Sequence, residues 1–191
     1  MRQVAIAAAV ALACLPAISQ KKTPDHGLQF KGVPLGATRE QFTAAHPEFE
    51  CTSAARFAPC PRFIISAVPG REHMGPTYGG QLVKSIVAEF DESSMCSVAI
   101  SLSPAQFDAV ADELTKKHGR PQISNAAPVE SVGGVKKQQV SMRWRLRDGQ
   151  IDATKYVGTI TDSMILLRTP KRVAEDAAAD AQRSSDAQRD L

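Results

Sequence analysis

The chain has 191 residues, with 23 lysine and arginine residues against 20 aspartate and glutamate residues, and so a formal net charge of +3. This balance argues against a nucleic-acid-binding protein, in which basic residues concentrate in a strongly basic stripe. The length suits one domain of ordinary size or two small repeats that share a core.

The first residues have the pattern of an export signal. Arg2 precedes an apolar run over Val4–Leu15, and the small residues Ala17 and Ser19 suit cleavage by a signal peptidase. We therefore expect residues 1–19 to be removed and the mature protein to be periplasmic or secreted.

Cys14 supports an alternative to this cleavage. A cysteine that closes an apolar run is acylated in bacterial lipoproteins, and such a lipid would tether the protein to a membrane. The run itself is shorter than the roughly 20 residues that cross a bilayer. Because no later stretch is comparable, we expect no transmembrane segment.

Three further cysteines are Cys51, Cys60 and Cys96. In an oxidising compartment they predict one disulfide and one leftover thiol. We favour a structural bridge between Cys51 and Cys60, which closes a compact loop, with Cys51–Cys96 as the alternative pairing. The spacing fits neither the close pair of a redox motif nor a zinc site, so no metal is expected.

A polar linker over residues 20–29 leads to the first expected helix. Thr38 and Gln41 have the spacing of a capping box, in which each side chain satisfies the other residue's backbone amide. Phe42 then faces inward, and Pro47 ends the helix early.

The second expected helix repeats this start. Ser103 and Gln106 match the first capping box, Pro104 suits the first helical position, and Gly119 ends the helix. An apolar stripe at helical spacing lies between: Phe107, Val110, Ala111 and Leu114. The matched starts indicate one motif used twice, although capping boxes are common enough for coincidence to remain the alternative.

Three short β-branched and aliphatic runs follow each helix. They are RFIISAV, QLVKSIVAEF and SVAISL, then SMRWRLR, QIDATKYV and SMILLRT. We predict an α+β domain over residues 30–169 with two helix-plus-three-strand repeats (30–102 and 103–169), an antiparallel sheet, and both helices packed on one face. Residues 170–191 form a polar tail, disordered or helical.

The dipeptide Asp148-Gly149 predicts a hairpin. A two-residue turn there would place Leu146 opposite Ile151 and Arg145 opposite Asp152. Alternation then directs one set of side chains to the core: Met142, Trp144, Leu146 and Ile151. It directs the other set outward: Arg143, Arg145, Arg147 and Asp152.

The outward arginines are the first candidate binding surface. Arg143, Arg145 and Arg147, near Lys155, lie on what we expect to be the uncovered sheet face. Guanidinium groups there would bind a carboxylate-bearing or phosphate-bearing partner through bidentate hydrogen bonds. The alternative is a solvated strand face on which Asp152 partly neutralises Arg145.

The loop PGREHMGPTYGG is the second candidate surface. It presents His73, Met74 and Tyr78 among glycines and prolines, and tyrosine and methionine are side chains that protein interfaces use as anchors. A merely flexible connection is the alternative.

Catalytic and cofactor-binding motifs are not found in the sequence. The histidines are scattered, and none belongs to a zinc-protease, triad or kinase-like motif: His26, His46, His73 and His118. Without a convergent acid, base and nucleophile, we do not expect an enzyme.

The phrases FKGVPLGATREQF, ELTKKHGRP and WRLRDGQI resemble small exported proteins of Gram-negative bacteria. The layout of helices and strands is similar to the tandem-repeat fold of the beta-lactamase inhibitor protein and to the lipoprotein of the outer-membrane assembly machine. Proteins of that type bind other proteins through the open sheet face and loops, without a cofactor. The resemblance implies an exported protein-interaction module, either an inhibitor or an envelope-assembly accessory whose partner is another envelope protein. A binder of a small anionic lipid or cell-wall fragment, held between sheet and helix, is the alternative.

Overall fold

The computed structural model describes residues 27–52, 60–68, 74–92, 94–130 and 133–189. The expected export signal with Cys14, most of the linker over residues 20–29, and His73 lie outside these ranges.

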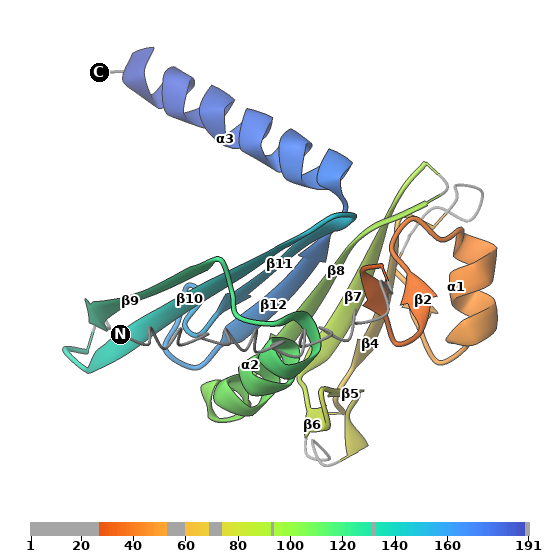
Figure 1. Cartoon of the computed structure of the whole chain (residues 1–191), viewed down its shortest axis with the longest axis horizontal. Coiled ribbons are helices and arrows are strands. Elements are labelled where there is room, and N and C mark those ends of the chain that lie inside the picture. The colour runs from red at the N-terminus through yellow and green to blue at the C-terminus, as the bar shows by residue number, and fades with distance from the viewer. Residues whose placement is uncertain (1–26, 53–59, 69–73, 93, 131–132, 190–191) are drawn as a thin grey trace, which may run out of the picture.

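One antiparallel sheet of eight strands dominates the molecule (Figure 1). Its strands, in spatial order, are β3 (Glu50–Cys51), β4 (Arg62–Ser66), β7 (Ser85–Asp91), β8 (Ser94–Leu102), β12 (Ser163–Arg168), β11 (Gly149–Thr154), β10 (Lys136–Leu146) and β9 (Ile123–Glu130). Two small hairpins lie outside it: β1 (Gln29–Phe30) with β2 (Val33–Pro34), and β5 (Thr77–Tyr78) with β6 (Gln81–Leu82). The helices are α1 (Arg39–Ala45), α2 (Pro104–His118) and α3 (Pro170–Arg189).

The prediction of two helix-plus-three-strand repeats is wrong. The described chain is mostly β, with one continuous sheet, and β8 pairs with β12 in its middle. The six expected strand runs do form strands, but the sheet adds β3 at one end and β9 at the other. Both additions are edge strands without the apolar alternation that half-buried strands show: β3 has two residues, and β9 is exposed over most of its length.

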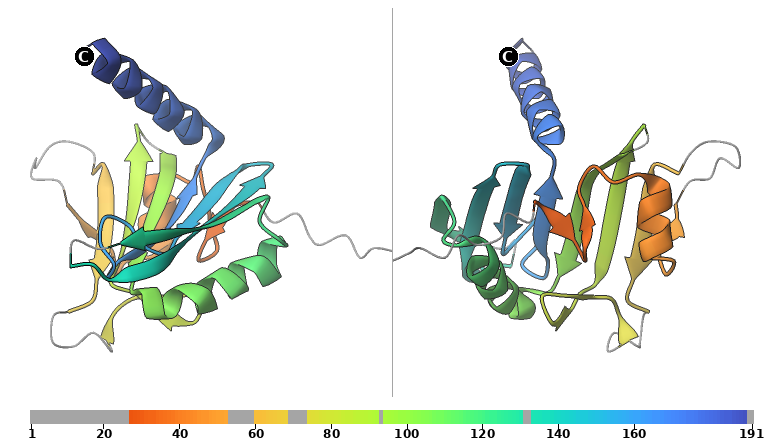
Figure 2. Two further views of the ribbon diagram at one scale, coloured as in Figure 1. Left: turned by 90° about the vertical axis from the view of Figure 1, so that its left-hand side faces the viewer. Right: turned by 45° about the vertical axis from the view of Figure 1, so that its right-hand side comes forward.

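Helices α1 and α2, together with the β1–β2 hairpin, cover one face of the sheet, which we call the inner face (Figure 2). Phe42 of α1 and Phe107 of α2 are both fully buried there. They belong to one core with the inward side chains of the central strands, which include Ile86, Val98, Ile100, Trp144, Ile151, Ile165 and Leu167. A sheet that buries one face in this way leaves the other face to solvent or to a partner.

The first capping box is confirmed, and the second is wrong. The Gln41 backbone amide donates to the Thr38 hydroxyl at 3.3 Å, and the Thr38 amide donates to the Gln41 side chain at 2.9 Å. In α2 the Ser103 hydroxyl contacts the Gln106 side chain instead of a backbone amide. Pro104 at the first helical turn therefore starts α2 without a side-chain cap.

The β10–β11 hairpin turns one residue earlier than the sequence predicts. Arg147 and Asp148 form the turn, so Trp144 lies opposite Ile151 and Arg143 opposite Asp152. The predicted pairing is wrong by two residues, but a shift of two keeps every side chain on its predicted face.

Contacts with the first described residues explain why the Asp-Gly pair is not itself the turn. The Asp148 carboxylate accepts a hydrogen bond of 2.5 Å from the Leu28 backbone amide. A side chain at Gly149 would collide with the Arg168 carbonyl oxygen and with Leu28. The glycine is therefore required for close approach of two backbones rather than for a left-handed turn.

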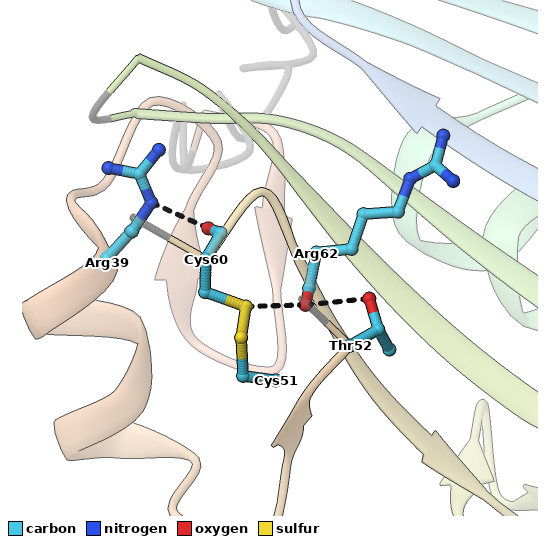
Figure 3. Close-up of a disulfide and its surroundings, with 5 residues drawn as sticks. All are labelled: Arg39, Cys51, Thr52, Cys60 and Arg62. Carbon is cyan, nitrogen blue, oxygen red and sulfur yellow. Dashed lines mark hydrogen bonds between the residues drawn. A yellow bond between two sulfur atoms is a disulfide. The ribbon is translucent and has the colours of Figure 1, made fainter. Parts of the chain in front are cut away.

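The Cys51–Cys60 disulfide is confirmed, with a Cα–Cα distance of 5.9 Å (Figure 3). The Cys60 carbonyl accepts a hydrogen bond of 2.8 Å from the Arg39 side chain, which ties the bridge to the first turn of α1. Cys96 is a buried free thiol on β8, and burial raises its pKa. The alternative Cys51–Cys96 pairing is therefore wrong.

Replacing Cys51 and Cys60 together with serine is expected to lower the free energy of unfolding by about 2.5 kcal/mol, because the unfolded chain regains the entropy of a closed loop of about ten residues. Urea unfolding of the purified protein measures the loss. A reducing agent should produce the same loss in the wild type and none in the double variant. Equal stability of the two proteins under oxidising conditions would contradict the expectation.

Helix α3 is long but polar, and it projects from one end of the sheet (Figure 1). No helix in the described part of the chain has both the length and the apolar character needed to cross a membrane.

Candidate functional site: the outer sheet face

The face opposite α1 and α2, which we call the outer face, is built from rows of side chains that run across the strands. Its middle row follows one line of register partners from edge to edge: Glu50, Ile64, Val87, Ala99, Leu166, Asp152, Arg143 and Ile123. All of them except Glu50 are half-buried. The row therefore combines an aliphatic centre with a charged pair toward β10.

The row beside it, which we call the hydroxyl row, is uncharged. It consists of Ser66, Ser85, Ser101, Met164, Thr154, Ser141 and Asn125. Apart from Met164, these side chains are short and carry a hydroxyl or amide group, and all of them are at least partly exposed. A surface of this kind is accessible to another backbone or side chain.

A third row, the charged row, lies at the end of the sheet from which α3 leaves. Its members are Arg62, Glu89, Ser97, Arg168, Gln150 and Arg145. Ion pairs connect this row to the middle row and to α3 in an unbroken alternation of sign: Arg143, Asp152, Arg168, Asp176, Arg172, Glu89 and Arg62.

This ion-pair chain anchors the beginning of α3 to the sheet. The Arg168 guanidinium lies 2.7 Å from Asp176 of α3, and Arg172 of α3 lies 3.5 Å from Glu89 of β7. Lys171 adds an ion pair to Asp91. Beyond Asp176, residues 177–187 are exposed apart from one half-buried serine. Helix α3 therefore leaves the middle row and the hydroxyl row open.

Asp152 is the centre of the chain of ion pairs. Burial raises the pKa of its carboxyl group, but hydrogen bonds from Arg143, Gln150 and Arg168 outweigh this effect and hold the pKa below its usual value. Arg168 is similarly enclosed, since its side chain is 13% exposed. Each arginine of this chain therefore has a carboxylate partner, and the arrangement is structural rather than a free cationic site.

The structure separates the four basic residues of the predicted arginine surface. Arg143 pairs with Asp152 at 2.5 Å, whereas Arg145 is exposed on the outer face and uses its backbone amide to bind Gln122. Arg147 lies in the turn. Lys155 lies on the side of α2, where it binds Asp108 at 2.7 Å and sits 5.8 Å from the centre of the Phe107 ring.

The structure also separates the predicted anchors of the loop. Met74 is 64% exposed. The Tyr78 ring instead stacks on Phe30, with 6.2 Å between the ring centres, and burial raises its pKa to about 12. Of the two predicted anchors that the structure describes, Met74 is therefore the exposed one.

Two hollows accompany these surfaces. One of about 410 Å³ lies on the outer face, where its walls include Asn125, Ser141, Arg143, Met164 and Leu166. Another of about 370 Å³ lies between α2 and the β5–β6 hairpin, with walls that include Lys31, Tyr78 and Lys117. In the part of the chain that the structure describes, no group of histidine, cysteine and acidic residues is arranged to hold a metal ion.

Sequence reasoning found the arginines of the outer face but missed its hydroxyl row. Each serine is ordinary within its own strand, and only the pairing of seven strands brings the row together. Alternation within RFIISAV, QLVKSIVAEF and SVAISL was the available signal, because it already points Ser66, Ser85 and Ser101 away from the core.

No protein-family model matches the chain, and neither the curated proteins nor the solved structures contain a match to it.

Proposed function

We propose that the protein is an interaction module that binds another folded protein through the middle row and the hydroxyl row of its outer face. The observation that carries the proposal is that these two rows lie on a sheet whose inner face holds the packed core, while the described ion pairs from α3 to the sheet go to the charged row and to Asp91 on β7. The hollow of about 410 Å³ across both rows offers a place for a protruding side chain.

The chemistry of the face favours a protein over other occupants. Its arginines Arg62, Arg143 and Arg168 are paired with carboxylates, which leaves little attraction for nucleic-acid phosphates. The large exposed apolar side chains of the described residues, Val68, Met74, Leu82 and Val135, lie off the two rows, so no large apolar side chain protrudes there to insert into a lipid surface. Aliphatic groups and uncharged hydroxyl groups make up most of the two rows, and they cost less to remove from water than ionised side chains do.

The disulfide and the pattern of the first residues support an exported protein with a role in the cell envelope. A structural disulfide persists in an oxidising environment, and the pattern of residues 1–19 is that of an export signal. An exported module of this kind would act as an inhibitor or as an accessory of envelope assembly, with an envelope protein as its partner.

A charged side chain in the hydroxyl row tests the proposal. Ser101→Arg places a long cation in the centre of the face without touching the core, because Ser101 points outward between Ser85 and Met164. A protein retained from native envelope extract by the wild type is expected to be lost, with at least about tenfold weaker binding of the purified pair. Ser184→Arg on the exposed part of α3 is the matched control and should retain it.

Two outcomes would overturn the proposal. One is that the wild type retains no protein from extract or from crosslinked cells. The other is that Ser101→Arg retains the same protein with the same affinity as Ser184→Arg. Arg145→Glu is a useful third variant, since Arg145 is exposed on the face and lies outside the chain of ion pairs.

The hollow between α2 and the β5–β6 hairpin favours a second candidate function, the binding of a small anionic lipid or cell-wall fragment. Lys31 and Lys117 line it together with Tyr78, and Glu113 is the acidic residue of its wall. Native mass spectrometry of protein purified from its own source distinguishes the two functions. A carried small anion that is lost in Lys31→Ala/Lys117→Ala supports this candidate, and a carried polypeptide supports the first.

A further inference from the structure

A third hollow lies toward the far ends of β9 and β10, beyond the hydroxyl row of the outer face. Its volume of about 510 Å³ is within the range of small-molecule binding sites. Val129 of β9 and Gln139 of β10 form one side, and both continue the outward-facing sets of their strands. The segment that links β11 to β12 forms the other side, with Tyr156 and Ile160. None of these residues belongs to the middle row or the hydroxyl row.

Hydrogen bonds within the protein hold both sides of this hollow in place. The Gln139 side chain donates to the Tyr156 carbonyl at 2.8 Å and accepts from the Tyr156 amide at 2.9 Å. The Thr159 hydroxyl donates to the Asp162 carboxylate at 2.6 Å, and hydrogen bonds from Lys84 and Thr159 lower the pKa of Asp162 to about 2. The hollow is therefore formed by the protein alone, and the side chains of Gln139 and Thr159 are already occupied.

The other residues of the wall favour an apolar ligand. Val129 and Ile160 are aliphatic, Tyr156 presents an aromatic ring, and Gly133 and Gly158 add backbone without a side chain. A ligand gains free energy here by removing apolar surface from water, and an aromatic ligand gains further from contact with the tyrosine ring. The body of the ligand should therefore be apolar and aromatic.

Glu130 gives the hollow its charge, since it is the only ionised side chain among the described residues of the wall. Within the described part of the chain it forms no ion pair. A Cβ atom built on Gly134 would lie 3.8 Å from its Oε1 atom, beside Gly133 of the wall. Lys136 and Lys137 follow on β10, but both are exposed and neither belongs to the wall. A carboxylate and an aromatic ring both attract a cation, so the ligand's charge should be positive.

We propose that this hollow binds a small amine with an apolar, aromatic body. The body lies between Val129, Tyr156 and Ile160, and the ammonium group donates hydrogen bonds to the Glu130 carboxylate. This site goes beyond the binding of a partner protein by the middle and hydroxyl rows, and it does not depend on that binding.

Three probes with one aromatic body test the proposal in the full mature chain. Tryptamine, tryptophol and indolepropionate differ in carrying an ammonium, a hydroxyl or a carboxylate group. Amide NMR titration of the isotope-labelled protein is expected to show that tryptamine shifts the signals of Tyr156 and Ile160. Tryptophol should bind about fivefold more weakly, because it lacks the attraction of a cation for the carboxylate and the ring. Indolepropionate should bind most weakly.

Two substitutions separate the charge from the apolar body. Glu130→Gln should weaken tryptamine about threefold and leave tryptophol unchanged. Asp112→Asn on the exposed side of α2 is the matched control and should change neither. Tyr156→Ala should weaken both by at least about fivefold. It should remain folded by circular dichroism, because its hydrogen bonds to Gln139 use backbone atoms.

Three results would overturn the proposal. The first is that tryptamine leaves the signals of Tyr156 and Ile160 unshifted up to its limit of solubility. The second is that Glu130→Gln binds tryptamine as tightly as the wild type does. The third is that indolepropionate binds at least as tightly as tryptamine, which would place Lys137 rather than Glu130 beside the charged group.

Discussion

Trp144→Ala is expected to lower the free energy of unfolding by about 3 to 5 kcal/mol, the largest loss that we expect from a single substitution. Trp144 is fully buried on the inner face of β10. Its indole nitrogen donates a hydrogen bond of 2.9 Å to the Gly119 carbonyl, the residue that ends α2. The side chain therefore fills the core and fixes the end of the helix to the sheet.

Urea unfolding followed by circular dichroism measures this loss. Trp144→Phe keeps most of the ring but not the hydrogen bond, and a smaller loss is expected from it. The neighbouring outward substitution Arg145→Ala should change stability by less than about 0.5 kcal/mol, because the Arg145 side chain is exposed. Similar losses for Trp144→Ala and Arg145→Ala would mean that β10 does not present alternate faces to core and solvent.

Asp152→Ala is expected to lower the free energy of unfolding by about 3 kcal/mol, because it leaves the enclosed Arg168 guanidinium without its partner on the sheet. Arg168 would retain Asp176, which belongs to α3. Asp176→Ala is the matched comparison, and it should cost less, since Asp176 is 32% exposed and Asp152 is 17% exposed. Equal costs would show that Asp152 is not the centre of the chain of ion pairs.

The lowered pKa of Asp152 predicts that the free energy of unfolding depends on pH. The pKa of Asp152 is lower in the folded protein than in the unfolded chain. Its contribution is therefore complete above the unfolded pKa of roughly 4 and is lost as the pH falls through the lower folded value. The decrease in the free energy of unfolding from neutral to acidic pH should be smaller in Asp152→Asn than in the wild type. Urea unfolding at a series of pH values measures the difference.

Sequence reasoning predicted the inner face well, because burial and strand alternation leave a clear pattern. Trp144 and Ile151 are inward, and Arg143 and Asp152 outward, as expected. The hairpin register was wrong because a shift of two residues conserves this pattern. The deciding contacts come from Leu28 and Arg168, which are remote in sequence.

Other elements could not be recognised from an alternation of apolar and polar residues. The β9 edge is exposed over most of its length, so no apolar alternation marks it, and it contains Pro128, a residue that is uncommon within strands. The chain of ion pairs depends on α3 meeting β7 and β12, which composition could not predict for a polar tail. The matched helix starts led to the prediction of two repeats with three strands each. The sheet instead has four strands on either side of its centre, between β8 and β12.

Site-specific photo-crosslinking in the organism that makes the protein tests the central claim, that the outer face binds a partner protein. A crosslinking side chain at Ser101 lies in the hydroxyl row, whereas one at Lys116 lies exposed on α2, on the other side of the sheet. We expect a discrete protein adduct from position 101 and none from position 116. An adduct from position 116 alone, or none from either position, would contradict the claim.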